Sequence, residues 1–237
     1  MSNPKDKSLS RSSQSEVASF IEKVAATPVR KRAGERGRLI FALDATASRE
    51  PTWDRASHIQ AEMFRETASL GGLDIQLVFY RGFLEFRATP WTSDSATLLK
   101  RMTAVSCLAG QTQIGRVLQH ALEETKKRRV NAVVFVGDCV EEDIDRLGQL
   151  AGELGLLGVP VFVFHEGDDA LARRAFEQIA RLSGGACCRF DAASAQQLRD
   201  LLSAVAVFAA GGRAALEDFS QRRGGEVLKL THQLRKR

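Results

Sequence analysis

This 237-residue sequence lacks the features that mark disulfide-bonded, zinc-binding and membrane-spanning proteins. Its four cysteines include no CxxC pair, which argues against a zinc knuckle or a thioredoxin-type site. Only 7% of the residues are aromatic, and no apolar run approaches the roughly 20 residues that a membrane-spanning helix needs. Residues 1–14 are polar and serine-rich, without the apolar core of a signal peptide. We therefore expect a globular, cytoplasmic protein with no membrane span.

Several signatures of phosphate and acyl chemistry are also missing. The chain has no Walker A loop, no Gly-x-Ser-x-Gly nucleophile elbow and no Asp-x-Asp-x-Thr motif. These absences favour a protein that is not an enzyme. A phosphotransfer or hydrolytic enzyme that uses Asp44 or Asp138 stays an alternative, because both carboxylates follow predicted strands.

The net charge of +5 is distributed unevenly along the chain. Residues 1–38 carry +5 and residues 211–237 carry +4, whereas residues 39–210 carry −4. The basic excess therefore belongs to the two ends, which could make weak electrostatic contacts with an anionic partner. A metal-free scaffold that acts through these basic tails is a second alternative.

Composition divides the chain into three parts. Residues 1–36 are predicted to form an N-terminal tail, a short helix at 15–26 and a basic linker. Residues 37–210 have the composition of one globular domain. Residues 211–237 are predicted to be a basic C-terminal tail with room for one short helix at 214–222.

Apolar runs of strand length alternate with amphipathic helical patterns across the central domain. Strands are predicted at residues 38–43, 73–80, 84–89, 132–136, 159–165 and 186–190. Helices are predicted at residues 53–69, 95–105, 112–128, 142–155, 170–183 and 194–209. This alternation predicts an α/β fold, with a Rossmann-like, doubly wound and mostly parallel sheet between two layers of helices. The close pair of strands within residues 73–89 predicts a hairpin that adds one antiparallel edge strand.

Oxygen-bearing side chains follow the predicted strands. Asp44, Thr46 and Ser48 come after the first strand, Thr112 opens a helix, and Asp138 follows the next buried strand. Functional sites of doubly wound sheets lie beyond the carboxyl ends of the strands, so we expect these side chains to converge. Two carboxylates and three hydroxyls suit a hard divalent cation, Mg²⁺ or Mn²⁺. Such an ion would keep enough positive charge to attract an external carboxylate.

The order of these residues resembles the von Willebrand factor type A (VWA) family and its metal-ion-dependent adhesion site, MIDAS. The run Asp44-x-Thr46-x-Ser48 is similar to the family's Asp-x-Ser-x-Ser motif, with Thr in place of the first Ser. Thr112 resembles the family's second-loop Thr, and Asp138 resembles the Asp of its Thr-Asp-Gly element.

The resemblance covers residues 37–210, with two departures beside Asp138. Gly137 stands where the family has Thr, and Cys139 stands where it has Gly. Neither position is expected to bind the metal directly. The resemblance implies a VWA-like fold and a non-catalytic protein-binding module, in which an Asp or Glu of a partner protein completes the coordination of Mg²⁺ or Mn²⁺.

Each polar residue also has a purely structural alternative. The first motif could cap a loop or helix, Thr112 could be the N-cap of its helix, and Asp138 could cap the turn that follows it. A solvated acidic face is predicted in the first turn of the helix at 142–155, where it would suit the helix dipole; it comprises Glu141, Glu142, Asp143 and Asp145.

Overall fold

The computed structural model describes residues 19–20, 23–24, 36–49, 72–190, 203–211 and 215, and the statements below concern these residues. The predicted helix at 53–69 lies outside them, as do residues 1–14, most of the C-terminal tail and most of the predicted helices at 15–26 and 214–222. Residues 194–202 of the predicted helix at 194–209 also lie outside them. Within the described part of the chain, no helix is long and apolar enough to cross a membrane.

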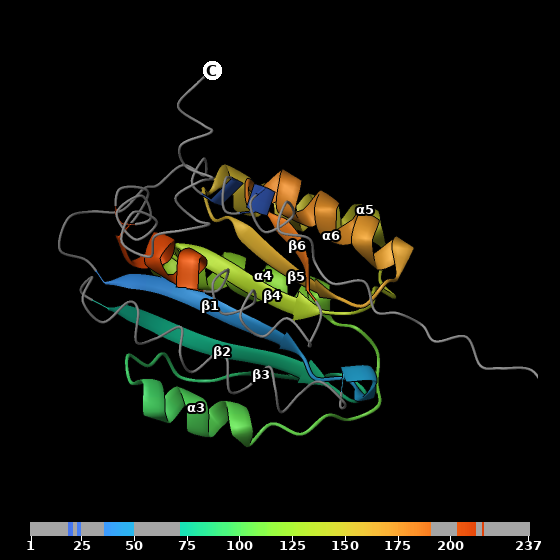
Figure 1. Cartoon of the computed structure of the whole chain (residues 1–237), viewed down its shortest axis with the longest axis horizontal. Helices are drawn as coiled ribbons and strands as arrows, with labels where there is room; N and C mark the ends of the chain where they lie inside the picture. Colours follow the sequence, from blue (N-terminus) through green and yellow to red (C-terminus); the bar gives the residue numbers. More distant parts are fainter. Residues whose placement is uncertain are drawn as a thin grey trace, which may run out of the picture.

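The centre of the molecule is a twisted sheet with strand order β3-β2-β1-β4-β5-β6 (Figure 1). The strands are β1 (Gly37–Asp44), β2 (Leu73–Arg81), β3 (Glu85–Ala88), β4 (Ala132–Gly137), β5 (Val161–Glu166) and β6 (Cys187–Phe190). All neighbours are parallel except β2 and β3, which pair in antiparallel fashion at one edge. The predicted doubly wound sheet with one antiparallel edge strand is confirmed.

Helices cover both faces of the sheet. They are α3 (Ser95–Thr103), α4 (Ile114–Lys127), α5 (Ile144–Leu156) and α6 (Ala170–Ser183), and residues 203–211 are also helical. Buried side chains of α4, α5 and α6 pack on one face. Those of α3 and of residues 203–211 pack on the other, together with Phe20 and Val24.

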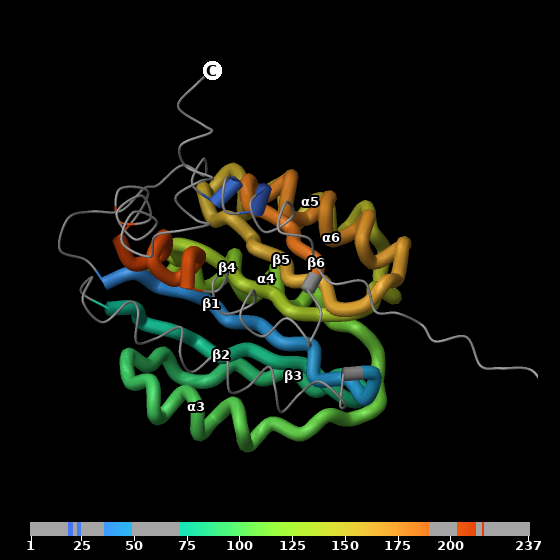
Figure 2. The backbone as a smooth tube through the Cα atoms, in the orientation of Figure 1, coloured from blue at the N-terminus to red at the C-terminus, as the bar shows by residue number. Residues whose placement is uncertain are grey.

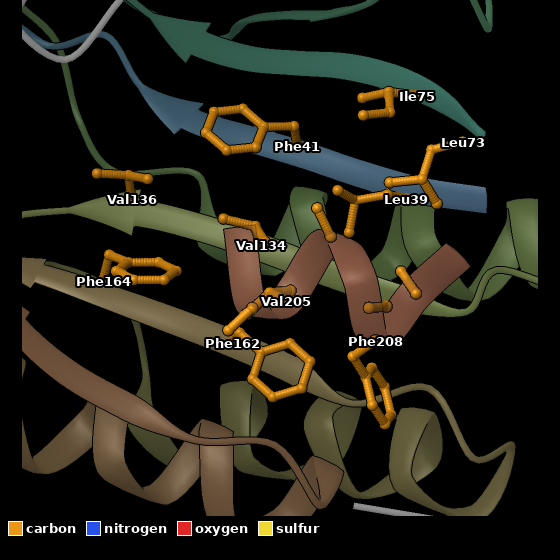
Figure 3. Close-up of a cluster of buried hydrophobic side chains, with 14 of the residues drawn as sticks. Leu39, Phe41, Leu73, Ile75, Val134, Val136, Phe162, Phe164, Val205 and Phe208 are labelled. Atoms are coloured by element: carbon orange, nitrogen blue, oxygen red, sulfur yellow. The ribbon is translucent and has the colours of Figure 1, made fainter. Parts of the chain in front are cut away.

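The face covered by residues 203–211 is a continuous apolar core (Figure 3). Phe208 meets Phe162 of β5 edge-to-face, with ring centroids 5.9 Å apart. At the start of β1 the helix comes so close that a Cβ on Gly37 would lie 2.1 Å from the carbonyl oxygen of Ala209. Only glycine fits at this close approach.

Side-chain caps set where several helices begin. Asp94, Asp143 and Asp169 each accept hydrogen bonds from backbone N–H groups in the first turn of α3, α5 and α6, respectively. Because Asp143 is the cap, α5 begins at Ile144, two residues later than predicted. The helix pattern could not reveal this boundary, since the preceding acidic residues fit a first helical turn equally well.

A buried ion pair joins the amino end of the sheet to α4. The Arg38 guanidinium lies 3.1 Å from the Glu124 carboxylate, and only 7% and 9% of the two side chains are exposed. The Trp91 indole N–H donates to the same carboxylate at 2.8 Å, and Lys127 pairs with its other oxygen at 2.8 Å. The guanidinium also lies 3.8 Å from the centroid of the Trp91 ring. This network holds β1, α4 and the segment after β3 together.

Candidate metal centre

The predicted ligands lie at the carboxyl ends of β1 and β4, the two central strands. Asp44 is the last residue of β1, and Asp138 directly follows β4. Leu43 pairs with Val136 across the two parallel strands, so Asp44 lies level with Gly137 one step further on. The shared register of the strands therefore brings the two carboxylates to one edge of the sheet, as the sequence predicts.

The packing around Gly137 gives a reason for this departure from the pattern that the sequence resembles. A Cβ at this position would lie 2.8 Å from Cζ of the Phe135 ring and 3.6 Å from the Cβ of Asp44. Threonine, the family's usual residue, would need the Phe135 ring to move. Glycine therefore leaves space for a large aromatic core residue beneath the site.

The Asp44 side chain is fully buried and held from two sides. Its Oδ1 accepts from the backbone N–H of Thr46 at 2.8 Å, and its Oδ2 accepts from the Tyr80 hydroxyl at 2.8 Å. Burial, followed by the charge of Asp44, raises the pKa of Tyr80 well above its ordinary value, so the phenol keeps its proton and donates. These two hydrogen bonds fix the orientation of the carboxylate.

Sequence reasoning missed Tyr80, although a signal was present. It is the only tyrosine of the chain and stands near the end of an otherwise apolar strand. In β2 it pairs in register with Asp44 of β1. This register places the Tyr80 hydroxyl beside Asp44. The register of two strands cannot be read from the sequence alone.

The two hydroxyls of the first motif lie side by side. Thr46 is 5% exposed, and its Oγ1 is 3.1 Å from the Oγ of Ser48. Ser48 lies in η1 (Ala47–Arg49), a short 3₁₀ turn, and is exposed. The motif therefore presents one buried hydroxyl and one that solvent or a partner can reach.

Asp138 carries an orphaned buried oxygen. Its Oδ1 is buried without a hydrogen-bond partner among the described residues, and the Cys139 thiol is a weak donor to the same carboxylate group. Potential ligand atoms of Asp44, Asp138 and Cys139 all lie within 4.8 Å of one another. A buried carboxylate oxygen without a donor is costly, and a bound cation would satisfy it. The donor set at this position therefore fits a metal ion.

Cys139 is a neighbour that the sequence did not place in the cluster. Burial, followed by the charges of Asp138 and Asp44, raises the pKa of its thiol to about 12. A neutral thiol is a poor ligand for a hard cation, which prefers oxygen. That Cys139 does not bind Mg²⁺ stays a prediction.

We expect Cys139 to react slowly with iodoacetamide. At pH 8 a thiol with a pKa of about 12 is ionised about a thousandfold less than an ordinary cysteine, because the thiolate is the nucleophile. Peptide-resolved mass spectrometry of the folded and urea-unfolded chain would measure the rate at this one residue. A rate in the folded chain equal to that in the unfolded chain would contradict the perturbed pKa.

Thr112 is tied to the loop after β4 by a reciprocal pair of hydrogen bonds. Its Oγ1 accepts from the backbone N–H of Glu141 at 3.1 Å, and its own N–H donates to the Glu141 carboxylate at 3.0 Å. It does not cap the helix, because α4 begins at Ile114 after Gln113. The pairing brings the Thr112 hydroxyl to the loop that carries Asp138.

The predicted solvated acidic turn is confirmed at Asp145, which is exposed in the first turn of α5, but Glu141 and Glu142 do not lie in the helix. Both precede α5, and Glu142 instead accepts hydrogen bonds from the backbone N–H groups of Ile114 and Gly115, the latter at 2.8 Å. Gln113 provides no side-chain cap, so this carboxylate satisfies donors that α4 leaves open. Sequence reasoning missed the role because the partners lie 27 and 28 residues apart.

His165 lies on the other side of Gly137 in the sheet. The two residues pair in the register of β4 and β5, and the fully buried imidazole packs against Phe176 with centroids 5.2 Å apart. Burial first, and the charge of Arg189 second, lower the pKa of His165. A neutral imidazole adds no positive charge beside Asp138.

Comparison with known proteins identifies the fold. No protein-family model and no curated protein matches the sequence. The SpRpn10 VWA domain aligns with a TM-score of 0.56 and 16% identity, over 71% of this chain and 94% of its own. The vWF domain of the type V pili tip protein Mfa5 from Porphyromonas gingivalis gives 0.57 and 11%, over 73% and 96%. The PilB minor pilin from Streptococcus sanguinis gives 0.56 and 11%, over 83% and 65%. This chain therefore has a VWA-like fold.

Proposed function

We propose that this chain is a non-catalytic, metal-dependent protein-binding module. In this proposal Mg²⁺ or Mn²⁺ is held by five oxygen-bearing residues at the carboxyl edge of the sheet, Asp44, Thr46, Ser48, Thr112 and Asp138. The observation that carries the proposal is the buried, unpartnered Oδ1 of Asp138 beside the carboxylate of Asp44. Support from the fold is general, because VWA-like domains are commonly protein-interaction modules.

The chain's own residues prepare the site in this proposal. Tyr80 and the Thr46 N–H hold the Asp44 carboxylate in one orientation, so little ordering remains when an ion arrives. Glu141 holds Thr112 beside the loop of Asp138. A bound ion would supply an electrophilic position for an external carboxylate, since two carboxylates and neutral hydroxyls leave it partly uncompensated. The partner is thus a protein that presents an Asp or Glu side chain.

Calorimetric titration of the full chain with MgCl₂ and MnCl₂ tests this function. We expect saturable binding by the wild type, and an affinity that falls more than about tenfold in Asp138→Asn, because the variant keeps the shape and loses the charge. Asp145→Asn is the matched control, since Asp145 is an exposed carboxylate in the first turn of α5.

Two results would count against the proposal. Heats that are unchanged in Asp138→Asn would place any bound ion elsewhere on the chain. An absence of binding by the wild type would leave the metal-free scaffold as the better hypothesis. A salt-dependent contact of the basic tails with an anionic partner would then be the next measurement.

A further inference from the structure

Two large apolar side chains project from the turn between β2 and β3. Phe83 is 82% exposed and Leu84 is 79% exposed, and with Gly82 they form the three-residue turn that we name the hairpin tip. Leu108, which accepts a backbone hydrogen bond from Gly82, is 46% exposed. Adjacent, almost fully exposed large apolar residues gain nothing for folding, and such patches mark interaction sites.

Contacts with neighbouring segments support the hairpin tip. The Arg81 guanidinium pairs with Glu85 across the turn at 3.0 Å and 3.3 Å, and Arg116 of α4 donates to the Leu84 carbonyl at 2.8 Å. A Cβ on Gly110 would lie 2.0 Å from the Gly82 carbonyl oxygen, so the two backbones are in direct contact. The exposed side chains therefore project from a supported turn, and binding would cost little ordering of the backbone.

Leu84 holds an unfavourable backbone conformation. Its φ of 64° is the only positive φ of a non-glycine residue in the described ranges. The last position of a three-residue hairpin turn commonly takes this left-handed conformation and favours glycine or asparagine there. A bulky leucine is strained, and its exposed side chain gains no packing to offset that strain. A selected role outside folding would explain the leucine.

The hairpin tip and the candidate metal centre are connected through the backbone. Gly82 N–H donates to the Leu108 carbonyl at 3.3 Å, and Leu108 N–H donates to the Ala45 carbonyl at 3.1 Å. Ala45 lies between Asp44 and Thr46 in the first motif. The ends of β1 and β2 meet at the same edge of the sheet (Figure 2). One partner could therefore touch both places.

The charges around the hairpin tip favour an acidic partner. Three guanidinium groups border it, those of Arg81, Arg87 and Arg116. Glu85 is the acidic residue among them and pairs with both Arg81 and Arg87. The net charge of these four side chains is positive, so a carboxylate-bearing partner complements them.

We propose that the hairpin tip is a docking surface for a partner segment that carries a large apolar side chain next to an Asp or Glu. The apolar side chain packs on Phe83 and Leu84, while the carboxylate reaches toward the arginines and the candidate metal centre. The apolar contact stands on the exposed tip alone. The carboxylate's contact with an ion rests on the proposed function above.

Peptide selection with the full chain tests the docking surface. The probe is a random 15-residue peptide library displayed on phage and selected on wild-type protein in Mg²⁺, with no counter-selection on the tip variants. We expect the enriched peptides to combine an aromatic or large aliphatic residue with an acidic one. Their synthetic versions should bind at least about tenfold more weakly to Phe83→Ser and Leu84→Asn by fluorescence anisotropy, as for central interface residues.

Leu156→Asn is the matched control for these variants, because Leu156 is 88% exposed at the end of α5. It should leave peptide binding unchanged. Peptides that bind Leu84→Asn as tightly as wild type would overturn the proposal. So would concentration-dependent dimers, or binding to phosphatidylcholine vesicles, that the tip variants abolish, since the occupant would then be a second copy or a membrane.

Chelation separates this proposal from the proposed function. If the tip docks a peptide but no ion is involved, affinity depends on Phe83 and Leu84 and is the same in EDTA. If both proposals hold, EDTA and Asp138→Asn weaken the peptide to a similar extent. If EDTA weakens peptide binding but neither tip variant does, the result supports the metal centre and overturns the docking surface.

Stability gives an independent readout. Leu84→Asn should raise the thermal unfolding midpoint by about 2 °C, because asparagine tolerates the left-handed conformation better than leucine. Leu156→Asn should not produce this rise. A lower midpoint in Leu84→Asn would show that the leucine supports the fold, which would remove the argument from strain.

Discussion

Replacing Glu124 with alanine is expected to lower the free energy of unfolding by about 3 kcal/mol or more. The change leaves the Arg38 guanidinium, whose side chain is only 7% exposed, without its carboxylate. It also removes the acceptor of the Trp91 indole N–H. An uncompensated buried charge costs more than the intact pair contributes, so the effect is larger than for a surface ion pair.

Urea unfolding at pH 7 measures this loss, with Glu123→Ala as the control. Glu123 is the adjacent residue of α4 and is exposed, so its removal should change stability by less than about 0.5 kcal/mol. A loss in Glu124→Ala as small as that of the control would contradict the structural role of the network.

The contribution of Glu124 should also depend on pH. Burial alone would raise the pKa of this carboxyl, but hydrogen bonds from Lys127 and Trp91 outweigh it and the pKa is lowered. A lowered pKa gives stability that is present above the unfolded value of about 4.3 and is lost as pH falls through the folded value. The difference between wild type and Glu124→Ala should therefore shrink in acid.

Local patterns were sufficient to predict the sheet. The apolar runs at residues 132–136 of β4 and 161–164 of β5 reflect strands buried on both faces, and the structure buries every residue of both strands. The hairpin was visible from the close spacing of its two strands. The first residue of a helix was harder to predict. Backbone geometry decides which of several acidic residues is the N-cap, as at Asp143, and the sequence pattern does not contain that geometry.

The candidate site was predictable for side chains that directly follow a strand. Asp44 and Asp138 converge because the two strands that precede them are parallel neighbours. Tyr80 was missed because it lies within a strand, and its contact with Asp44 depends on the register of β1 and β2. Glu142 was missed because its contacts with Ile114 and Gly115 depend on how a loop packs against the start of α4. The strained conformation of Leu84 was equally hidden, since nothing in its sequence context indicates a left-handed residue.

The second large effect expected is on the coupling of Mg²⁺ to stability. If the ion binds the folded chain alone, Mg²⁺ at 100 times its dissociation constant adds about 2.7 kcal/mol to the free energy of unfolding. Asp44→Asn should abolish that gain. Asparagine keeps an Oδ1 that can accept from the Thr46 N–H, but it has no charge with which to hold the ion.

The variant is chosen so that loss of the ion and loss of the fold give different results. Asp44→Ala would leave the buried Tyr80 hydroxyl without its acceptor and would destabilise the chain by itself. Asp44→Asn preserves the volume, but its amide NH₂ replaces the oxygen that accepts from the Tyr80 hydroxyl, so the effect of the ion is taken as the difference between Mg²⁺ and EDTA within each protein. Urea unfolding of both proteins in EDTA and in Mg²⁺ gives the four values needed. Equal stabilisation of the two by Mg²⁺ would mean that the ion binds without Asp44, and the oxygen-ligand site would then have to be abandoned.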